Sequence, residues 1–270
     1  MKKALACVCV LMIGVSAANA GTVFAMDLRT APNNIISFPV GTPGYNLIGQ
    51  CAIDSYAIDF DNSGTTLYAI EVLSSAPAGI GTINTTTGAY TQIAPVSGMT
   101  GSPGGLSCDP LTGTFYALAT SGAGANNLYT VNPNTGAATL IGAMGGTTEL
   151  FVDIAISPTG QMFAHDIASD SIYSVDKSTG ATTLLGATGY ACNYAQGMDF
   201  DYADGNLYAT LYTGGGTGVF ARIDLTTGAA TPLLDTSSWN AEMEMAINSP
   251  IPEPASLTLL ALAALALRRR

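Results

Sequence analysis

Residues 127–136 read Asn-Leu-Tyr-Thr-Val-Asn-Pro-Asn-Thr-Gly, and Ala-Ala-Thr-Leu-Ile follows at 137–141. Apolar and polar residues alternate on both sides of the Asn-Pro-Asn-Thr-Gly segment, which is rich in turn-forming residues. The pattern therefore predicts two short antiparallel strands joined by a tight turn. Two similar segments, 105–109 and 114–119, come before this pair, so one unit of the chain holds four strands.

This unit recurs five times along the chain. A Gly-x-apolar-aromatic-Ala pattern ends in alanines that are 44, 48, 47 and 45 residues apart, and its second copy carries one extra residue. These alanines are Ala25, Ala69, Ala117, Ala164 and Ala209. A second marker, Thr-Gly before a threonine-rich segment, has glycines at 88, 136, 180 and 228. Four strands in a period of roughly 40 to 50 residues are typical of a β-propeller blade.

The two ends of the repeat region predict a closed ring. Residues 21–28 form the second strand of a unit, with 33–38 and 45–49 after them and no first strand before them. Residues 243–249 form a first strand with no later strands. We therefore expect the C-terminal strand to pair with the N-terminal blade, which closes a five-bladed all-β propeller over residues 21–249 and leaves no inner edge open.

Composition supports an all-β fold and excludes some partners. Hydrophobic residues make up 48% of the chain and charged residues only 10%, which provides a core but few residues that favour surface helices. The formal net charge is -11, and only Arg29, Lys177 and Arg222 are cations away from the two ends. Such a chain cannot neutralise a phosphate backbone, so nucleic acid is not expected as a partner.

The N-terminal 20 residues have the features of a signal peptide. Lys2 and Lys3 precede an apolar stretch over residues 4–15, and Ala18-Asn19-Ala20 follows as a small-x-small cleavage site. The apolar stretch is too short to span a membrane stably. We expect export, with Gly21 as the first residue of the mature chain.

Residues 250–270 form a second targeting signal. Pro252-Glu253-Pro254 is followed by thirteen uncharged residues and then by Arg268, Arg269 and Arg270. An apolar helix of this length covers roughly 20 Å, which makes it a marginal membrane anchor. The segment resembles the PEP-CTERM sorting signal of Gram-negative bacteria, which occurs with exosortases and exopolysaccharide production. The resemblance implies an exosortase-type partner, transient contact with the inner membrane, and release to the cell surface, outer membrane or extracellular matrix.

The repeats, and residues 127–136 above all, resemble the divergent propeller repeats of exported bacterial proteins. Proteins of this kind include enzymes, lectins and scaffolds, so the resemblance implies a fold and leaves the function open.

Cysteine and histidine give little catalytic or metal-binding chemistry. After signal removal Cys51, Cys108 and Cys192 remain. Cys108 falls at a core position, whereas Cys51 and Cys192 both lie in loops that lead into first strands, so a disulfide between them and two free thiols are both possible. The only histidine, His165, is next to Asp166 on a strand, and the two side chains therefore point in opposite directions. We predict no metal site and no cofactor.

Carboxylates on the innermost strands allow an enzymatic alternative. Asp59, Asp153, Asp199 and Glu244 are predicted to line the central channel. Asp153 or Asp199 with Glu244 would supply the acid and base of a glycoside hydrolase or lyase. The other interpretation is that these carboxylates bind backbone amides and hold the blades together.

Four aromatic residues precede first strands and are candidates for ligand stacking, namely Tyr56, Tyr190, Tyr194 and Trp239. The loops on their face of the propeller vary in length between blades, which is where binding sites are usually built. We therefore predict a surface or matrix protein that binds a polysaccharide or another surface component without catalysis. A structural protein with no small ligand, or an enzyme that uses the inner carboxylates, are the alternatives.

Overall fold

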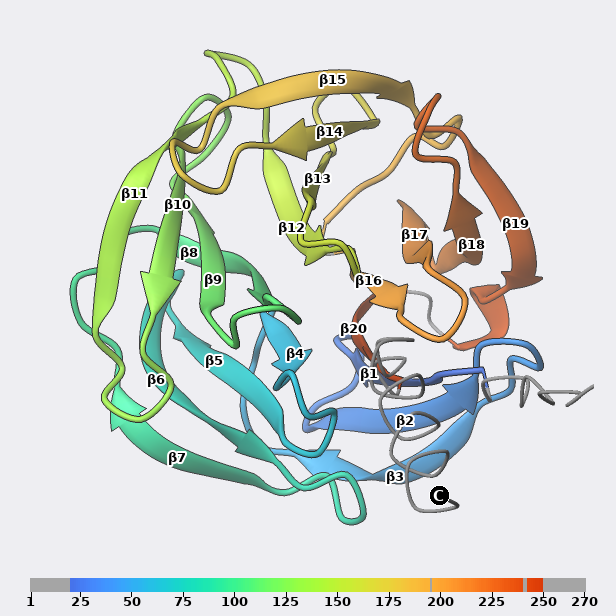
Figure 1. The fold of residues 1–270 in the computed structure, drawn as a ribbon. Coiled ribbons are helices and arrows are strands. Elements are labelled where there is room, and N and C mark those ends of the chain that lie inside the picture. The colour runs from blue at the N-terminus through green and yellow to red at the C-terminus, as the bar shows by residue number, and fades with distance from the viewer. Residues whose placement is uncertain (1–19, 195, 240–241, 250–270) are drawn as a thin grey trace, which may run out of the picture.

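The computed structural model describes residues 20–194, 196–239 and 242–249, and these form a closed ring of β-sheets (Figure 1). The only helical element among them is the short 3-10 turn η1, Ser237–Trp239. No helix within the described residues is long and apolar enough to cross a membrane. Residues 1–19 of the predicted signal peptide and all of the predicted sorting tail lie outside the described residues.

Five sheets of four strands each make up the ring, and we number these blades from the N-terminus. The first blade contains, from the axis outward, β20 (Met243–Asn248), β1 (Thr22–Asp27), β2 (Asn33–Pro39) and β3 (Asn46–Cys51). The second contains β4 (Ile58–Phe60), β5 (Leu67–Leu73), β6 (Ala76–Ile83) and β7 (Tyr90–Pro95). The third contains β8 (Ser102–Cys108), β9 (Phe115–Thr120), β10 (Asn126–Val131) and β11 (Ala138–Met144). The fourth contains β12 (Phe151–Ile156), β13 (Met162–Asp166), β14 (Ser171–Val175) and β15 (Thr182–Ala187). The fifth contains β16 (Met198–Asp201), β17 (Asn206–Gly214), β18 (Thr217–Ile223) and β19 (Ala230–Asp235).

The ring closes as the sequence predicts. Strand β20 pairs antiparallel with β1 in a register that matches Thr22 with Asn248 and Asp27 with Met243. Two hydrogen bonds also join the closing strands to the fifth blade. The Gly21 amide donates to Asp201 at 2.8 Å, and the Tyr202 amide donates to the Ser249 hydroxyl at 2.7 Å. Every strand of the ring among the described residues lies between Thr22 and Asn248.

Apolar clusters between neighbouring blades form the core. One cluster combines Ile70 and Ile80 of the second blade with Leu106 and Phe115 of the third, and each of the other four junctions has a cluster of the same kind. The innermost strands, such as β4 and β16, are buried along their whole length. The outermost strands keep exposed residues such as Leu47 and Leu184, and each carries a β-bulge.

The structure explains why the Thr-Gly marker has a glycine: this residue lies in a tight turn that packs closely against the neighbouring blade. Gly136 lies in the β10–β11 turn with a φ of +70°, a conformation that residues with a Cβ resist. A Cβ at Gly136 would lie 2.1 Å from the carbonyl oxygen of Pro95 in the second blade. The same geometry recurs at Gly228, where a Cβ would lie 2.2 Å from the carbonyl oxygen of Gly186. Glycine therefore serves both the turn and the close contact between blades.

Candidate functional site

The candidate site is a cavity of about 170 Å³ at one mouth of the central channel. It lies on the face with the variable loops, where the innermost strands begin. Its walls come from all five blades: Tyr56 before β4, Ser102, Pro103 and Gly104 of β8, Thr120 of β9, Val152 of β12, Tyr194 before β16, and Glu242 before β20. A cavity to which every blade contributes must lie on the axis of the ring, and we call it the mouth cavity.

Tyr194 is the most exposed residue of the mouth cavity, with 61% of its surface open to solvent. Its φ of +59° is unusual for a bulky residue and costs on the order of 1 kcal/mol or more. The loop is fixed on both sides, because the Asn193 amide donates to the Tyr212 carbonyl at 2.8 Å and the Gln196 side chain donates to the same carbonyl at 3.0 Å. This exposed ring, held in an unusual conformation, makes Tyr194 a candidate binding residue.

Tyr56 forms the other aromatic wall and is half-buried. Burial raises the pKa of its hydroxyl, and the nearby negative charges of Asp54 and Glu242 raise it further. The Tyr56 hydroxyl therefore remains neutral and can donate or accept a hydrogen bond. Tyr56 and Tyr194 are the two predicted aromatics that the structure brings together in one cavity.

An arginine that the sequence analysis did not assign to the site lies beside this cavity. The Arg29 guanidinium approaches the Glu242 carboxylate at 3.8 Å, and it hydrogen-bonds to the hydroxyl of Tyr212. Its central carbon lies 5.6 Å from the centre of the Tyr212 ring, a distance at which a cation and an aromatic face attract each other. The position of Arg29 in the β1–β2 loop of the variable face was the available signal for this role.

Trp239 and Tyr190, the other two predicted stacking residues, do not line the mouth cavity. The Trp239 ring packs against Phe38 at 5.4 Å and Tyr45 at 5.8 Å between centroids. It thereby fills the junction between the fifth and first blades, where the chain closes. Tyr190 packs against the apolar cluster between the fourth and fifth blades. Both side chains contribute to the core, so the aromatic part of the candidate site is Tyr56 and Tyr194.

The inner-strand carboxylates link neighbouring blades through backbone amides. Asp59 accepts from the amide of Cys108 in the next blade at 2.7 Å, and Asp199 accepts from the amide of Ile247 in the next blade at 2.6 Å. Each also accepts from the amide of the residue that follows it on its own strand. These contacts match the structural interpretation of the carboxylates.

Asp153 and Glu244 are the other two carboxylates. On their strands they lie two residues nearer the mouth than the positions equivalent to Asp59 and Asp199. Asp153 hydrogen-bonds to the amide of Met198 in the next blade. The amide of Ile58 lies near the Glu244 carboxylate and lowers its pKa, but neither Glu244 oxygen reaches hydrogen-bond geometry with a donor. Four of the five blades thus contribute one inner acid each, and the third has Ser107 at the position equivalent to Asp59.

Burial controls the protonation of these acids. All four are at most 5% exposed, and burial raises each pKa well above its ordinary value. Negative neighbours raise the pKa of all four further, for example Glu244 beside Asp153 and Asp199 beside Asp59. The pKa of Asp199 rises to about 7, because burial outweighs the amides that bind its charged form. The acids lie below the floor of the mouth cavity, and none of them is among its wall residues.

Of the two alternatives left open by the sequence, a disulfide between Cys51 and Cys192 or two free thiols, the structure has the free thiols. Cys51 and Cys192 are free, buried thiols, and each belongs to a different apolar cluster. Burial raises the pKa of both thiols, to about 12 at Cys192. Within the described residues no group of three or more His, Cys, Asp or Glu side chains could hold a metal ion. His165 is fully buried with both ring nitrogens unpaired, and burial lowers its pKa to about 4.

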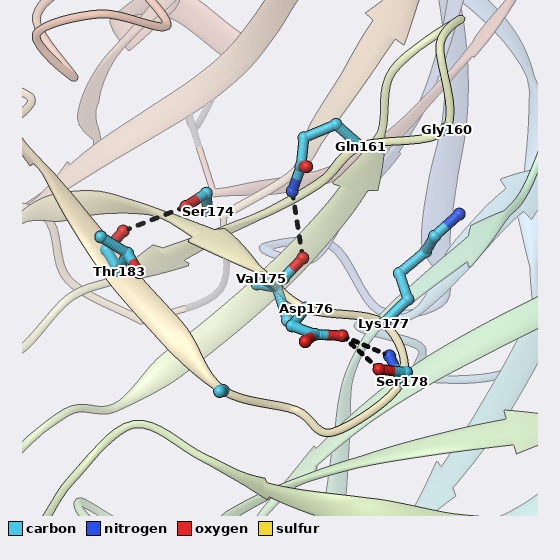
Figure 2. Close-up of a pocket in the computed structure, with 9 residues that line it drawn as sticks. Gly160, Gln161, Ser174, Val175, Asp176, Lys177, Ser178 and Thr183 are labelled. Carbon is cyan, nitrogen blue, oxygen red and sulfur yellow. Dashed lines mark hydrogen bonds between the residues drawn. The ribbon is translucent and has the colours of Figure 1, made fainter.

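A second cavity, of about 640 Å³, lies at the opposite face in the fourth blade (Figure 2). Gln161 donates to the Val175 carbonyl at 3.1 Å, and the Ser178 hydroxyl donates to Asp176 at 2.6 Å. The Lys177 side chain points away from Asp176 (Figure 2) and pairs with Asp109 of the third blade at 2.6 Å. These polar groups bond to one another or across the seam, so this hollow is a weaker candidate than the mouth cavity.

The fold and the axial cavity define a five-bladed β-propeller with a small mouth on its variable-loop face. The chain belongs to the family described as "Repeat of unknown function (DUF6923)", whose profile matches residues 28–241. A comparison with curated proteins finds no match.

Solved structures share the fold at low sequence identity. A structure titled "Nidogen/Laminin Complex" is 13% identical with a TM-score of 0.52, covering 84% of this chain and 98% of that one. A protein of unknown function from Bacteroides thetaiotaomicron is 16% identical with a TM-score of 0.50, covering 76% and 56%. TolB from Acinetobacter baumannii is 15% identical with a TM-score of 0.50, covering 82% and 54%. This chain therefore spans about half the length of two of these three proteins.

Proposed function

We propose that this protein is an exported binding module that holds a polysaccharide, or another component of the cell surface or matrix, at the mouth cavity without catalysing its turnover. The observation that carries the proposal is the convergence of all five blades on one cavity with two tyrosines, Tyr56 and the exposed Tyr194. Tyrosine rings stack on the apolar faces of sugars, and their hydroxyls hydrogen-bond to sugar hydroxyls.

The state of the inner acids favours binding over hydrolysis. A glycosidase needs an acid and a base that reach the sugar from an open site. Asp153, Asp199 and Glu244 are at most 4% exposed, and two of them already bind backbone amides of the next blade. The hydrolase or lyase alternative would require the inner strands to separate before substrate could reach these carboxylates.

Export and sorting are part of the same proposal and rest on the two terminal signals. Cleavage after Ala20, recognition of Pro252-Glu253-Pro254 by an exosortase-type enzyme, and retention by the terminal arginines would carry the propeller to the cell surface or matrix. Expression of the full chain in a host with and without an exosortase tests this route. We expect cell-surface or medium localisation only with the exosortase, and a chain that lacks residues 250–270 should be released to the periplasm in both hosts.

A glycan array tests the binding function, with residues 21–249 as the probe. We expect a restricted set of glycans to bind, and Tyr194→Ala to reduce that binding at least tenfold. Tyr116→Ala is the matched control, because Tyr116 lies near Lys177 at the opposite face. Turnover assays on each bound glycan complete the test. Product formation, or binding that is insensitive to Tyr194→Ala, would contradict the proposal.

A further inference from the structure

The charge around the mouth cavity is negative. Glu242 lines the cavity, and Asp54 is close enough for its charge to act on Tyr56. Of the three cations among the described residues, only Arg29 lies at this face. Lys177 pairs with Asp109 at the opposite face, and Arg222 lines a separate cavity with Asp224.

Arg29 neutralises only part of this charge. It is shared between the Glu242 carboxylate at 3.8 Å and the hydroxyl and ring of Tyr212. Its side chain is thereby directed to the rim, and it is not one of the residues that line the cavity. One cation therefore stands beside two carboxylates, Glu242 and Asp54, at this mouth.

A second carboxyl group, that of Glu244, lies in β20 just after Glu242, and its raised pKa keeps it uncharged. Glu242 and Glu244 are two residues apart at the start of β20, where the pairing with β1 continues through the bond from the Leu28 amide to the Glu242 carbonyl. Residues at this spacing on a strand project to the same side. Glu244 is 1% exposed and is not among the residues that line the cavity, so the negative charge at the mouth comes from Glu242 and Asp54.

We propose that the mouth cavity binds a sugar residue that carries a free ammonium group, as in a de-N-acetylated amino-sugar polymer. This inference rests on the proposed polysaccharide-binding function and names its ligand class. The sugar ring stacks on Tyr194, and its ammonium donates to Glu242, with Tyr56 as a second polar contact. At about 170 Å³ the cavity holds one such residue and not a longer segment.

The same charges disfavour acidic polymers. A uronate or sulfate group would meet Glu242 with Asp54 nearby, and the protein as a whole carries a formal charge of -11. Like charges in one site repel each other, and a strongly acidic surface lowers the rate at which an anion approaches. The negative electrostatic potential that repels a uronate also raises the local concentration of an amine at the mouth cavity.

Three β-1,4-linked tetrasaccharides test the inference, because they differ only in the group on carbon 2: an ammonium, an acetamide or a hydroxyl. Calorimetric titration of residues 21–249 at pH 6 should give at least tenfold tighter binding for the free amine than for the other two. Raising the salt concentration should weaken binding of the amine alone, since charge attraction is screened by ions.

Glu242→Gln should lower the affinity for the amine to that of the hydroxyl analogue and leave the hydroxyl analogue unchanged. Asp224→Asn is the matched control, because it removes one negative charge at the opposite face from a turn position that Asn84 and Asn132 occupy in other blades. It should leave all three affinities unchanged.

The outcomes separate the inference from the function on which it rests. Equal binding of the three tetrasaccharides, with loss of all three in Tyr194→Ala, overturns the amine preference and retains the sugar-binding function. Tighter binding of the acetamide form does the same. Binding of a lysine-rich peptide with no binding of any sugar overturns both, and identifies the mouth as a site for protein partners.

Discussion

At the scale of single residues, Tyr194 connects conformational strain with function. A side chain with a Cβ in the left-handed region costs about 1 to 2 kcal/mol relative to glycine. Tyr194 has a φ of +59° and 61% exposure, so little packing energy offsets this cost. Its ring lies 6.3 Å from the Tyr212 ring, and we expect it to serve the proposed ligand binding more than stability.

Replacing Tyr194 separates these two roles. Tyr194→Gly should be more stable than Tyr194→Ala by about 1 kcal/mol, which reverses the usual order at exposed positions, because glycine adopts this φ without strain. Both variants should lose glycan binding to the same extent. Urea denaturation gives the stability order, and titration with a bound glycan gives the affinity. An alanine variant that is the more stable of the two would show that the loop does not hold residue 194 in the left-handed region.

The inner acids predict that stability depends on pH. The pKa of Asp199 is 3.8 when unfolded and about 7 when folded, so the folded state binds the extra proton between these values. Stability is therefore greatest near the lower end of this window, and it falls as the pH rises toward 7 and slightly beyond. The other three acids, whose pKa values are also raised, contribute in the same direction. Asp199→Asn should reduce the slope of the thermal midpoint against pH over pH 5 to 8, and an unchanged slope would exclude Asp199 as its source.

His165 acts in the opposite direction over part of the same range. Its pKa falls from 6.5 to about 4 on folding, because the buried ring cannot hold a charge. The unfolded state binds the proton first as the pH falls, so stability contributed by the neutral ring is lost from about pH 6.5 down to 4. His165→Leu removes this loss, and it also removes two unpaired buried nitrogens. We expect the variant to be more stable by about 1 to 3 kcal/mol at pH 7 and by more at pH 5, as measured by urea denaturation.

At the scale of strands and turns, two glycines of similar φ separate the effect of turn strain from the effect of close packing between two blades. Gly136 and Gly205 have φ values of +70° and +75°. A Cβ at Gly136 would lie 2.1 Å from the Pro95 carbonyl oxygen, whereas a Cβ at Gly205 meets nothing within 4 Å. Gly205→Ala should cost about 1 to 2 kcal/mol from backbone strain alone, and Gly136→Ala should cost about 1 to 3 kcal/mol more, because the second and third blades must separate. Equal losses in urea denaturation would contradict a tight seam.

Strand positions could be predicted from the sequence because the same strand and turn pattern recurs at equivalent positions in every unit. The predicted strand at residues 127–131 is β10 at Asn126–Val131, and the predicted closing strand at 243–249 is β20 at Met243–Asn248. Turn residues such as the Thr-Gly pairs fix where each hairpin reverses, and their period fixes the number of blades. Local chemistry repeated five times was sufficient for the fold.

The site was less predictable, because side-chain direction in loops depends on contacts that only the closed ring creates. Tyr194 and Trp239 both precede an inner strand, yet one ring is exposed at the mouth and the other packs against Phe38 of the first blade. The contact between residues 38 and 239 exists only after closure, so no local pattern signals it. Arg29 was overlooked for the same reason, since its partners Glu242 and Tyr212 are far away in the sequence.

At the scale of the whole molecule, closure places the two ends of the propeller side by side. Thr22 pairs with Asn248, so the first and the last strand of the ring lie side by side in the same blade (Figure 1). The junction between the fifth and first blades is sealed by apolar and aromatic packing around Phe38, Phe220 and Trp239. Because β20 completes the first blade, the inner edge of β1 is covered, and the core depends on residues from both ends of the chain.

A circular permutant tests this closure directly. Joining Ser249 to Gly21 through about three glycines and opening the chain in the exposed β9–β10 loop at Gly122 should give a protein within about 1 kcal/mol of the parent, because the linker spans ends that are already adjacent. A second permutant with the same linker, opened within β1 between Ala25 and Met26, should fail to fold, since it interrupts the ladder that joins β20 to β2. Urea denaturation and size-exclusion chromatography measure both. If the first permutant is unfolded or associates into dimers while the parent is monomeric, then β20 completes a blade of another molecule, and the axial cavity must be assigned to that assembly.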